Sequence, residues 1–299
     1  MRQKTLQRGF TLIELIMVIV IMGVIGASVA VFMKSPIDAY FASGRRAELT
    51  DVADTSARRI SRDLHKALPN SVRTPGQTCV EFIPTKTGAR YRADGAGALA
   101  INSAATSFNM LGSNTAFAGA AIPIDQQVTS GDLIVVNNLG IPVSDAYLNV
   151  TPLNRTVVNG VPAVSTNGVP TPANETTITI NAANAVIFPL ASGGNRFHVV
   201  PAAEQVVGYA CTSTGTGLDA NGTGNGNLIR YVTALPRTAD QQSNCTNAIA
   251  SPTWQSILAT KVSYCSFEQR NALVRITLTV SSQGEAVSLY HQVHVDNTP

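Results

Sequence analysis

Hydrophobic and polar positions divide the chain into segments of different periodicity. Residues 10–33 read FTLIELIMVIVIMGVIGASVAVFM, an apolar run whose only charged side chain is Glu14. About 20 apolar residues are enough to cross the ~30 Å core of a bilayer, so this run predicts a transmembrane helix. A carboxylate at membrane depth is energetically unfavourable, and Glu14 is therefore a candidate functional residue.

Beyond residue 33 the pattern changes to that of an amphipathic helix. Apolar and small residues recur at helical spacing and define one stripe, formed by Leu49, Val52, Ala53, Ser56, Ile60, Leu64 and Leu68. We expect helix from Phe10 to Leu68, with a kink at Pro36 because proline removes a backbone donor. Pro69 is expected to stop the helix.

From about residue 74, short runs rich in β-branched residues alternate with turn-rich gaps, which indicates strands. The expected strands are Val80–Ile83, Leu133–Asn137, Thr176–Ile180, Arg196–Val200, Gln205–Cys211, Leu228–Thr233, Lys261–Phe267, Ala272–Ser281 and Ala286–Val295. The last three predict an antiparallel meander with one apolar face, on which the helical stripe packs. Residues 95–175 are expected to be long surface insertions. The predicted fold class is α+β, with a long N-terminal helix on an antiparallel sheet.

Basic residues precede the apolar run, at Arg2, Lys4 and Arg8. Positive charge holds that end of a span in the cytoplasm, so the remainder is expected outside the inner membrane. A conventional secretory signal cleaved near Ala30 and a plain single-pass anchor are alternatives, but neither gives Glu14 a role. A cut between Gly9 and Phe10 gives Glu14 a role, because it frees an amine four residues before this carboxylate.

Residues 8–15, RGFTLIEL, resemble the processing site of type IV prepilins and type II secretion pseudopilins. The resemblance implies that a prepilin peptidase cuts after Gly9 and that the new N-terminal Phe10 is methylated. It also implies that Glu14 pairs with the amino terminus of a neighbouring subunit during filament assembly. The implied partners are the peptidase, other minor and major pilins, an inner-membrane assembly platform and membrane lipid. The predicted division is a leader (1–9), a transmembrane helix (10–33), an amphipathic helix with linker (34–73) and a periplasmic head (74–299).

Lateral packing of apolar helices is the expected physical basis of assembly. Small residues allow close approach of helices in a membrane, here Gly23, Gly26, Ala27 and Ala30. Residues 36–73 further resemble minor pilins of the MSHA (mannose-sensitive haemagglutinin) pilus system. The expected function is a structural subunit of the inner membrane that initiates or caps such a pilus and enters the extracellular filament. A minor pseudopilin of a type II secretion system and a pilus-tip adhesin, with residues 95–175 as its binding surface, are alternatives.

Charge and cysteine content agree with an exported head. The chain carries 21 basic and 18 acidic residues, and the leader accounts for the excess, so no nucleic-acid partner is expected. Four cysteines in an oxidising compartment suggest two disulfides, for which three connectivities are possible. We favour Cys79 with Cys265 and Cys211 with Cys245. No C-x-x-C pair indicates a zinc site.

Motifs for catalysis or metal binding are incomplete. Asp219–Asn227 resembles a calcium loop, but Arg230 occupies the position of the bidentate glutamate. His291 and His294 point to opposite faces of an expected strand, while His65 and His198 have no matching ligand partner. G-x-S-x-G and H-E-x-x-H motifs are absent from the sequence. We therefore expect no enzymatic activity, no cofactor and no metal.

Overall fold

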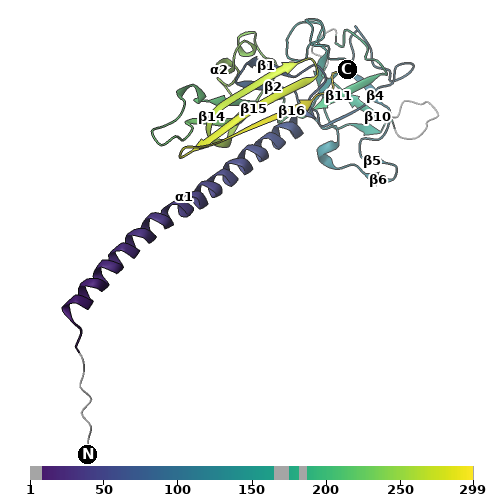
Figure 1. Cartoon of the computed structure of the whole chain (residues 1–299). Helices are drawn as coiled ribbons and strands as arrows, with labels where there is room; N and C mark the ends of the chain where they lie inside the picture. The colour runs from purple at the N-terminus through teal and green to yellow at the C-terminus, as the bar shows by residue number, and fades with distance from the viewer. Residues whose placement is uncertain (1–8, 165–174, 182–186, 299) are drawn as a thin grey trace, which may run out of the picture. The chain divides into compact units, whose positions relative to one another are not determined.

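The computed structural model describes residues 9–164, 175–181 and 187–298 (Figure 1). The expected leader up to residue 8, and residues 165–174 of the expected insertion, lie outside the described residues. The chain divides into two compact units, Met1–Glu48 and Leu49–Pro299. Helix α1 (Leu12–Leu64) contributes to both.

Helix α1 spans Leu12–Leu64 and continues through Pro36. Its expected end at Leu68 was wrong by one helical turn. Ala67 forms a β-bridge with Pro84, and the amide of Leu68 donates to the carbonyl of Ile83, the residue after β2, at 2.8 Å. The backbone of these residues therefore belongs to the edge of the head rather than to the helix.

A seven-stranded antiparallel sheet forms the main part of the head (Figure 1). Its strand order is β1-β2-β12-β13-β14-β15-β16. Its strands are β1 (Arg73–Gly76), β2 (Cys79–Phe82), β12 (Val206–Thr212), β13 (Gly226–Thr233), β14 (Trp254–Arg270), β15 (Leu273–Ser282) and β16 (Glu285–His294). The short helices η2 (Thr214–Thr216), η3 (Asp240–Gln242) and α2 (Cys245–Ala248) lie in its connections. The strands expected around residues 80, 206, 228 and 261–295 are thus confirmed.

Strand β14 is much longer than the sequence predicted. Lys261 has a φ of +61° and the pairing register shifts on both sides of it, which indicates a β-bulge. The bulge breaks the alternation of faces, so that Trp254–Thr260 does not read as the start of the same strand. Asn271 and Gln283 adopt positive φ in the tight turns that join the last three strands, as expected for a meander.

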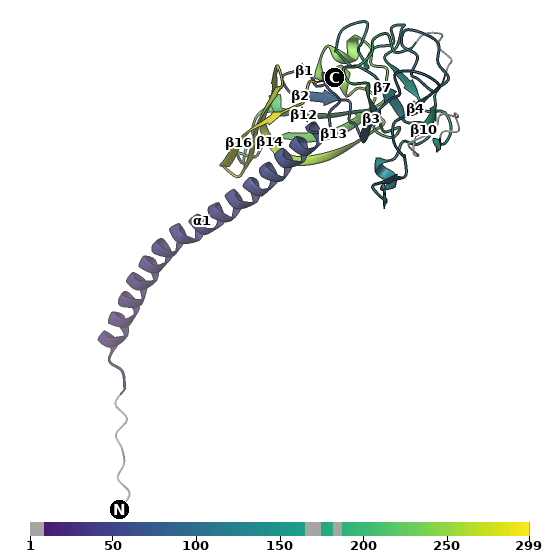
Figure 2. The same ribbon diagram turned by 90° about the vertical axis from the view of Figure 1, so that its right-hand side faces the viewer.

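The C-terminal part of α1 packs against one face of this sheet, as predicted. Leu49, Ala53, Ile60 and Leu64 are buried in one cluster with sheet residues such as Phe82. Figure 2 shows the sheet curling around this end of the helix. Complete burial of each large aliphatic side chain contributes about 1.5–3 kcal/mol. The α+β fold class is confirmed.

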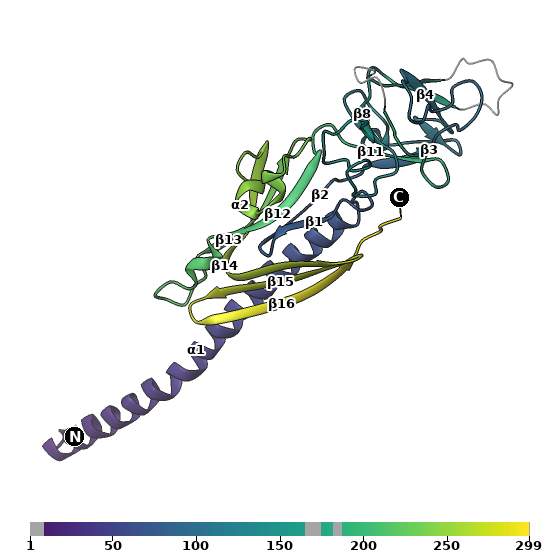
Figure 3. The same cartoon turned by 90° about the horizontal axis from the view of Figure 1, so that it is seen from above.

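The opposite face of the sheet is covered by the β13–β14 connection that contains α2 (Figure 3). Cys79 lies in this cluster and is bonded to Cys245, whereas Cys211 is bonded to Cys265 on the face that packs on α1. Four cysteines do form two disulfides, but the favoured pairing was wrong. Ala210 is opposite Cys79 in the ladder, and the alternation of side chains therefore places Cys211 on the other face.

The expectation that residues 95–175 are merely surface insertions was also wrong. Phe108, Val128 and Ile134 are buried in a second hydrophobic core beyond the C-terminal end of α1 (Figure 3). The strands around it form small antiparallel sheets in the orders β3-β11-β7-β8, β4-β10-β9 and β5-β6. Their bounds, with those of one short helix, are β3 (Thr87–Arg90), β4 (Ser107–Met110), β5 (Ala116–Phe117), β6 (Ala120–Ala121), η1 (Ile124–Gln126), β7 (Leu133–Val135), β8 (Arg155–Val157), β9 (Ala163–Val164), β10 (Thr176–Thr179) and β11 (Arg196–Val200).

Candidate functional site at the N-terminal motif

Helix α1 begins with a capping box formed by Thr11 and Glu14. The backbone amide of Thr11 donates to Glu14 Oε2 at 2.9 Å, and the Thr11 hydroxyl donates to the same oxygen at 3.0 Å. In return, the amide of Glu14 donates to Thr11 Oγ1 at 3.3 Å. These reciprocal bonds satisfy backbone donors that the first helical turn leaves without partners. They also explain why the helix begins at Leu12. The start expected from the sequence, Phe10, was two residues too early.

Thr11 is a residue that the sequence interpretation missed. The spacing T-x-x-E before an apolar run is the signature of a capping box and stands in the sequence at residues 11–14. Glu14 therefore has a structural role within its own chain, beside the assembly role that the resemblance implies. Any test of Glu14 has to separate its charge from its capping function.

Gly9 and Phe10 lie in an exposed, non-helical segment just before the cap. Phe10 is 89 % exposed, and a Cβ atom placed at Gly9 would meet nothing within 4 Å in the part of the chain that the structure describes. The peptide bond between these residues is therefore open to an enzyme. Cleavage there would leave a free amine on Phe10, one residue before the cap and two residues before the first residue of the helix.

The apolar part of α1 presents its side chains outward along its whole length. The window of α1 that is long and apolar enough to cross a membrane has no buried residue. A Cβ atom at Gly23 or Gly26 would meet nothing within 4 Å. Gly23, Gly26, Ala27 and Ala30 follow one another at spacings that place them on one helix face, as close packing of helices requires.

The head contains a buried ion pair that fastens the α2 connection to the sheet. Arg237 Nη2 donates to Glu81 Oε2 at 3.2 Å and to the carbonyl of Ala248 at 2.8 Å. The Tyr231 hydroxyl donates to the same carboxylate oxygen at 3.4 Å. Glu81 is completely buried, and its Oε1 has no partner among the residues that the structure describes. Burial raises the pKa of Glu81, although Arg237 opposes this effect.

The raised pKa of Glu81 predicts a pH-dependent difference from a Glu81→Gln variant. Because native Glu81 binds its proton more readily than the unfolded chain does, the free energy of unfolding falls as the pH rises from the ordinary glutamate pKa to the raised one. Glutamine resembles the protonated acid, so the stability of the wild type relative to the variant should decline across this window. Denaturant titration at several pH values measures this difference. A relative gain of the wild type with rising pH would show that Arg237 outweighs burial.

The other ionisable candidates do not assemble into a metal site. Asp219 Oδ1 accepts the amides of Asn221 and Thr223, both at 2.8 Å, and so closes its own loop. Among the described residues, no group of three or more histidine, cysteine, aspartate or glutamate side chains lies close enough to hold a metal ion. His198 is largely buried in β11, and burial lowers its pKa.

Comparison with protein-family models matches residues 4–30 to the prokaryotic N-terminal methylation motif. No curated protein and no solved structure matches the chain. The motif covers the Gly9–Phe10 junction, the capping box and the first part of the apolar helix. It implies processing by a prepilin peptidase and assembly with other pilins. Together with helix α1, it supports a type IV pilin-like protein that is anchored in the membrane.

Proposed function

We propose that this chain is a minor pilin that helps to initiate or cap a type IV pilus of the MSHA type, similar to the minor pilin MshO. The prepilin peptidase cuts after Gly9, the new terminus at Phe10 is methylated, and the head faces the periplasm. The subunit has a structural role and no enzymatic activity. The finer assignment to the MSHA system rests on the resemblance of residues 36–73 to minor pilins of that system.

The observation that carries this proposal is the start of α1. An exposed glycine–phenylalanine junction is followed at once by a capped helix whose apolar side chains face outward, with one carboxylate in its first turn. Cleavage at the junction places an ammonium group and a carboxylate near the same helix end. The ammonium of one subunit can then form an ion pair with Glu14 of its neighbour, in which both partners are charged, whereas Thr11 donates to Glu14 from uncharged groups.

This pairing gives lateral packing of the helices a defined register. Apolar contacts alone distinguish poorly between neighbouring axial positions, since lipid and side chains are similarly apolar. A charge pair in a medium of low dielectric constant strongly favours the one position in which both charges are satisfied. The subunit can therefore leave the bilayer only as part of an ordered bundle of pilin helices.

Replacing Gly9 by valine tests the proposed processing. A Cβ atom at this position would meet nothing within 4 Å among the described residues, so the variant should fold and insert but keep its leader at full mass. Intact mass measurement and N-terminal sequencing of the membrane-purified chain report cleavage and methylation. Gly44→Ala is a matched control, because Gly44 also lies in open space but is far from the junction, and it should be processed normally.

Cells that carry the uncleaved variant should also show fewer surface pili, because an unprocessed initiator cannot enter a filament. Normal cleavage of Gly9→Val would refute the proposed junction. Normal pilus numbers with impaired adhesion would favour the tip adhesin. Normal pili with impaired protein secretion would favour the pseudopilin.

A further inference from the structure

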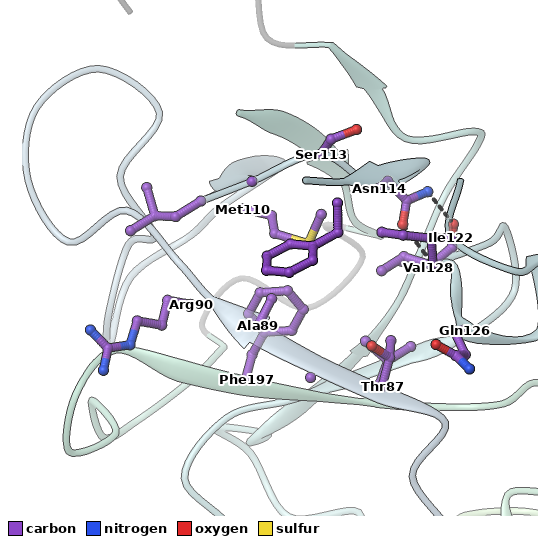
Figure 4. A pocket seen from close by; sticks show the side chains of 15 residues that line it. Thr87, Ala89, Arg90, Met110, Ser113, Asn114, Ile122, Gln126, Val128 and Phe197 are labelled. Carbon is purple, nitrogen blue, oxygen red and sulfur yellow. Dashed lines mark hydrogen bonds between the residues drawn. The ribbon is translucent and has the colours of Figure 1, made fainter. Parts of the chain in front are cut away.

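The second core of the head contains an open cavity of about 510 Å³ (Figure 4). Its apolar floor includes Met110, Val128 and Phe197, which are all buried. The β5–β6 hairpin contributes Phe117 to the lining, and this ring is 79 % exposed. The volume falls within the range of about 300–1,000 Å³ that is common for ligand sites.

The cavity lies where the chain after β4 leaves the edge of β3. The two segments pair through the Arg92 amide, which donates to the Asn109 carbonyl at 2.9 Å, and through the Leu111 amide, which donates to the Arg90 carbonyl at 2.8 Å. Gly112 then adopts a φ of +119°, a conformation that favours glycine. The Thr176 hydroxyl on β10 bonds to the Gly112 carbonyl and accepts the Asn114 amide, both at 3.0 Å. These bonds hold the segment on β10, so the pairing with β3 stops after Leu111.

Strand β3 is consequently an edge strand that faces the cavity. It pairs on one side with β11 and is the terminal strand of its sheet. Backbone groups of alternate residues point to the same side of an antiparallel strand. Gly88 therefore directs its amide and carbonyl to the side on which the Arg90 carbonyl meets Leu111. Gly88 also lines the cavity. Its missing side chain accommodates β11, since a Cβ atom there would lie 3.0 Å from the carbonyl oxygen of Phe197.

We propose that this cavity is a docking site for an extended peptide segment of a partner protein. The peptide adds a strand along β3, with main-chain hydrogen bonds to Gly88, and inserts an apolar side chain onto the floor formed by Met110 and Phe197. A sugar fits less well, because an apolar floor leaves hydroxyl groups without partners. Arg90 is an exposed lining residue of the cavity and forms no ion pair among the described residues, so an acidic residue in the peptide is favoured.

The test uses the full chain in lipid nanodiscs and a peptide labelled on its amino terminus, fluorescein-Thr-Val-Thr-Phe-Thr-Glu-amide. Fluorescence anisotropy should show saturable binding. Phe117→Ala should weaken this binding roughly tenfold, an effect of the size expected for truncation of an aromatic anchor. Ile124→Ala is the matched control, since Ile124 is 70 % exposed on the adjacent helix η1 but does not line the cavity. It should leave binding unchanged.

Two further probes distinguish the proposed mode from others. A peptide methylated on its backbone nitrogens keeps the phenylalanine but loses the strand hydrogen bonds, so it should bind much more weakly. Equal binding of both peptides, or binding of 1-anilinonaphthalene-8-sulfonate alone, would overturn strand addition in favour of a site for small apolar molecules. Binding to a glycan array without peptide binding, or equal effects of Phe117→Ala and Ile124→Ala, would likewise overturn the proposal. Because the probes act on the head, these outcomes are independent of cleavage at Gly9.

Discussion

Replacing Glu14 by alanine is expected to abolish incorporation into pili while membrane insertion and cleavage continue. The variant keeps the apolar helix and the Gly9–Phe10 junction, so the steps before assembly are unaffected. During assembly, the ammonium of a neighbouring subunit would lose its partner in an environment of low dielectric constant. Breaking a buried charge pair is unfavourable by about 3–5 kcal/mol, which corresponds to a loss of incorporation of more than roughly a hundredfold. Immunoblots of sheared pili and of membranes, normalised to mature subunit, measure this ratio.

Two companion variants separate the charge of Glu14 from its capping role. Glu14→Gln keeps a side chain that can complete the capping box but removes the charge. Thr11→Val keeps the charge and the backbone donor of residue 11 but removes the hydroxyl that bonds to Glu14. If charge pairing drives assembly, the glutamine variant should fail like alanine and the valine variant should still assemble. Assembly of Glu14→Gln at the wild-type level would show that Glu14 acts only as part of the helix cap.

The N-terminal motif could be predicted from the sequence because its chemistry is local. A leader, a glycine, an apolar run and one carboxylate are adjacent along the chain. The strands were also predictable where alternation is regular, as in β15, whose even-numbered residues Val274, Ile276 and Leu278 are buried. The capping role of Thr11 was equally local, and the T-x-x-E spacing would have revealed it.

Features that depend on contacts distant in sequence were not predictable in the same way. The bulge at Lys261 conceals the first half of β14, since a positive φ interrupts the alternation. In residues 95–175 the buried positions are separated by loops and meet only through the ladders of short strands, as Phe108 does with Ile178. Short runs rich in glycine, alanine and serine have too little local signal to predict such a core. The cavity beside β3 depends on the same long-range packing.

Neighbouring residues of a strand point to opposite faces of the sheet, so a shift of one position decides which cysteine another can reach. The pairing of Cys79 with Cys245 closes a separation of 166 residues and ties the α2 connection to β2. The Glu81–Arg237 pair fastens the same connection nearby. The disulfide and the ion pair therefore hold the β13–β14 connection on the face of the sheet that is opposite to α1.

Removing the Cys79–Cys245 disulfide is therefore expected to destabilise the head strongly. A Cys79→Ala/Cys245→Ala double variant should lose about 3–5 kcal/mol of unfolding free energy, since the bond restricts a long loop of the unfolded chain. Denaturation followed by the fluorescence of Trp254, the single tryptophan, measures this loss. Removal of the Cys211–Cys265 bond, which closes 54 residues, should cost about 1 kcal/mol less from loop entropy.

Reduction of the wild type separates the effect of the bonds from that of the shortened side chains. Non-reducing peptide mapping provides the decisive control, because a peptide that joins Cys79 to Cys265 would contradict the placement of these residues on opposite faces of the sheet.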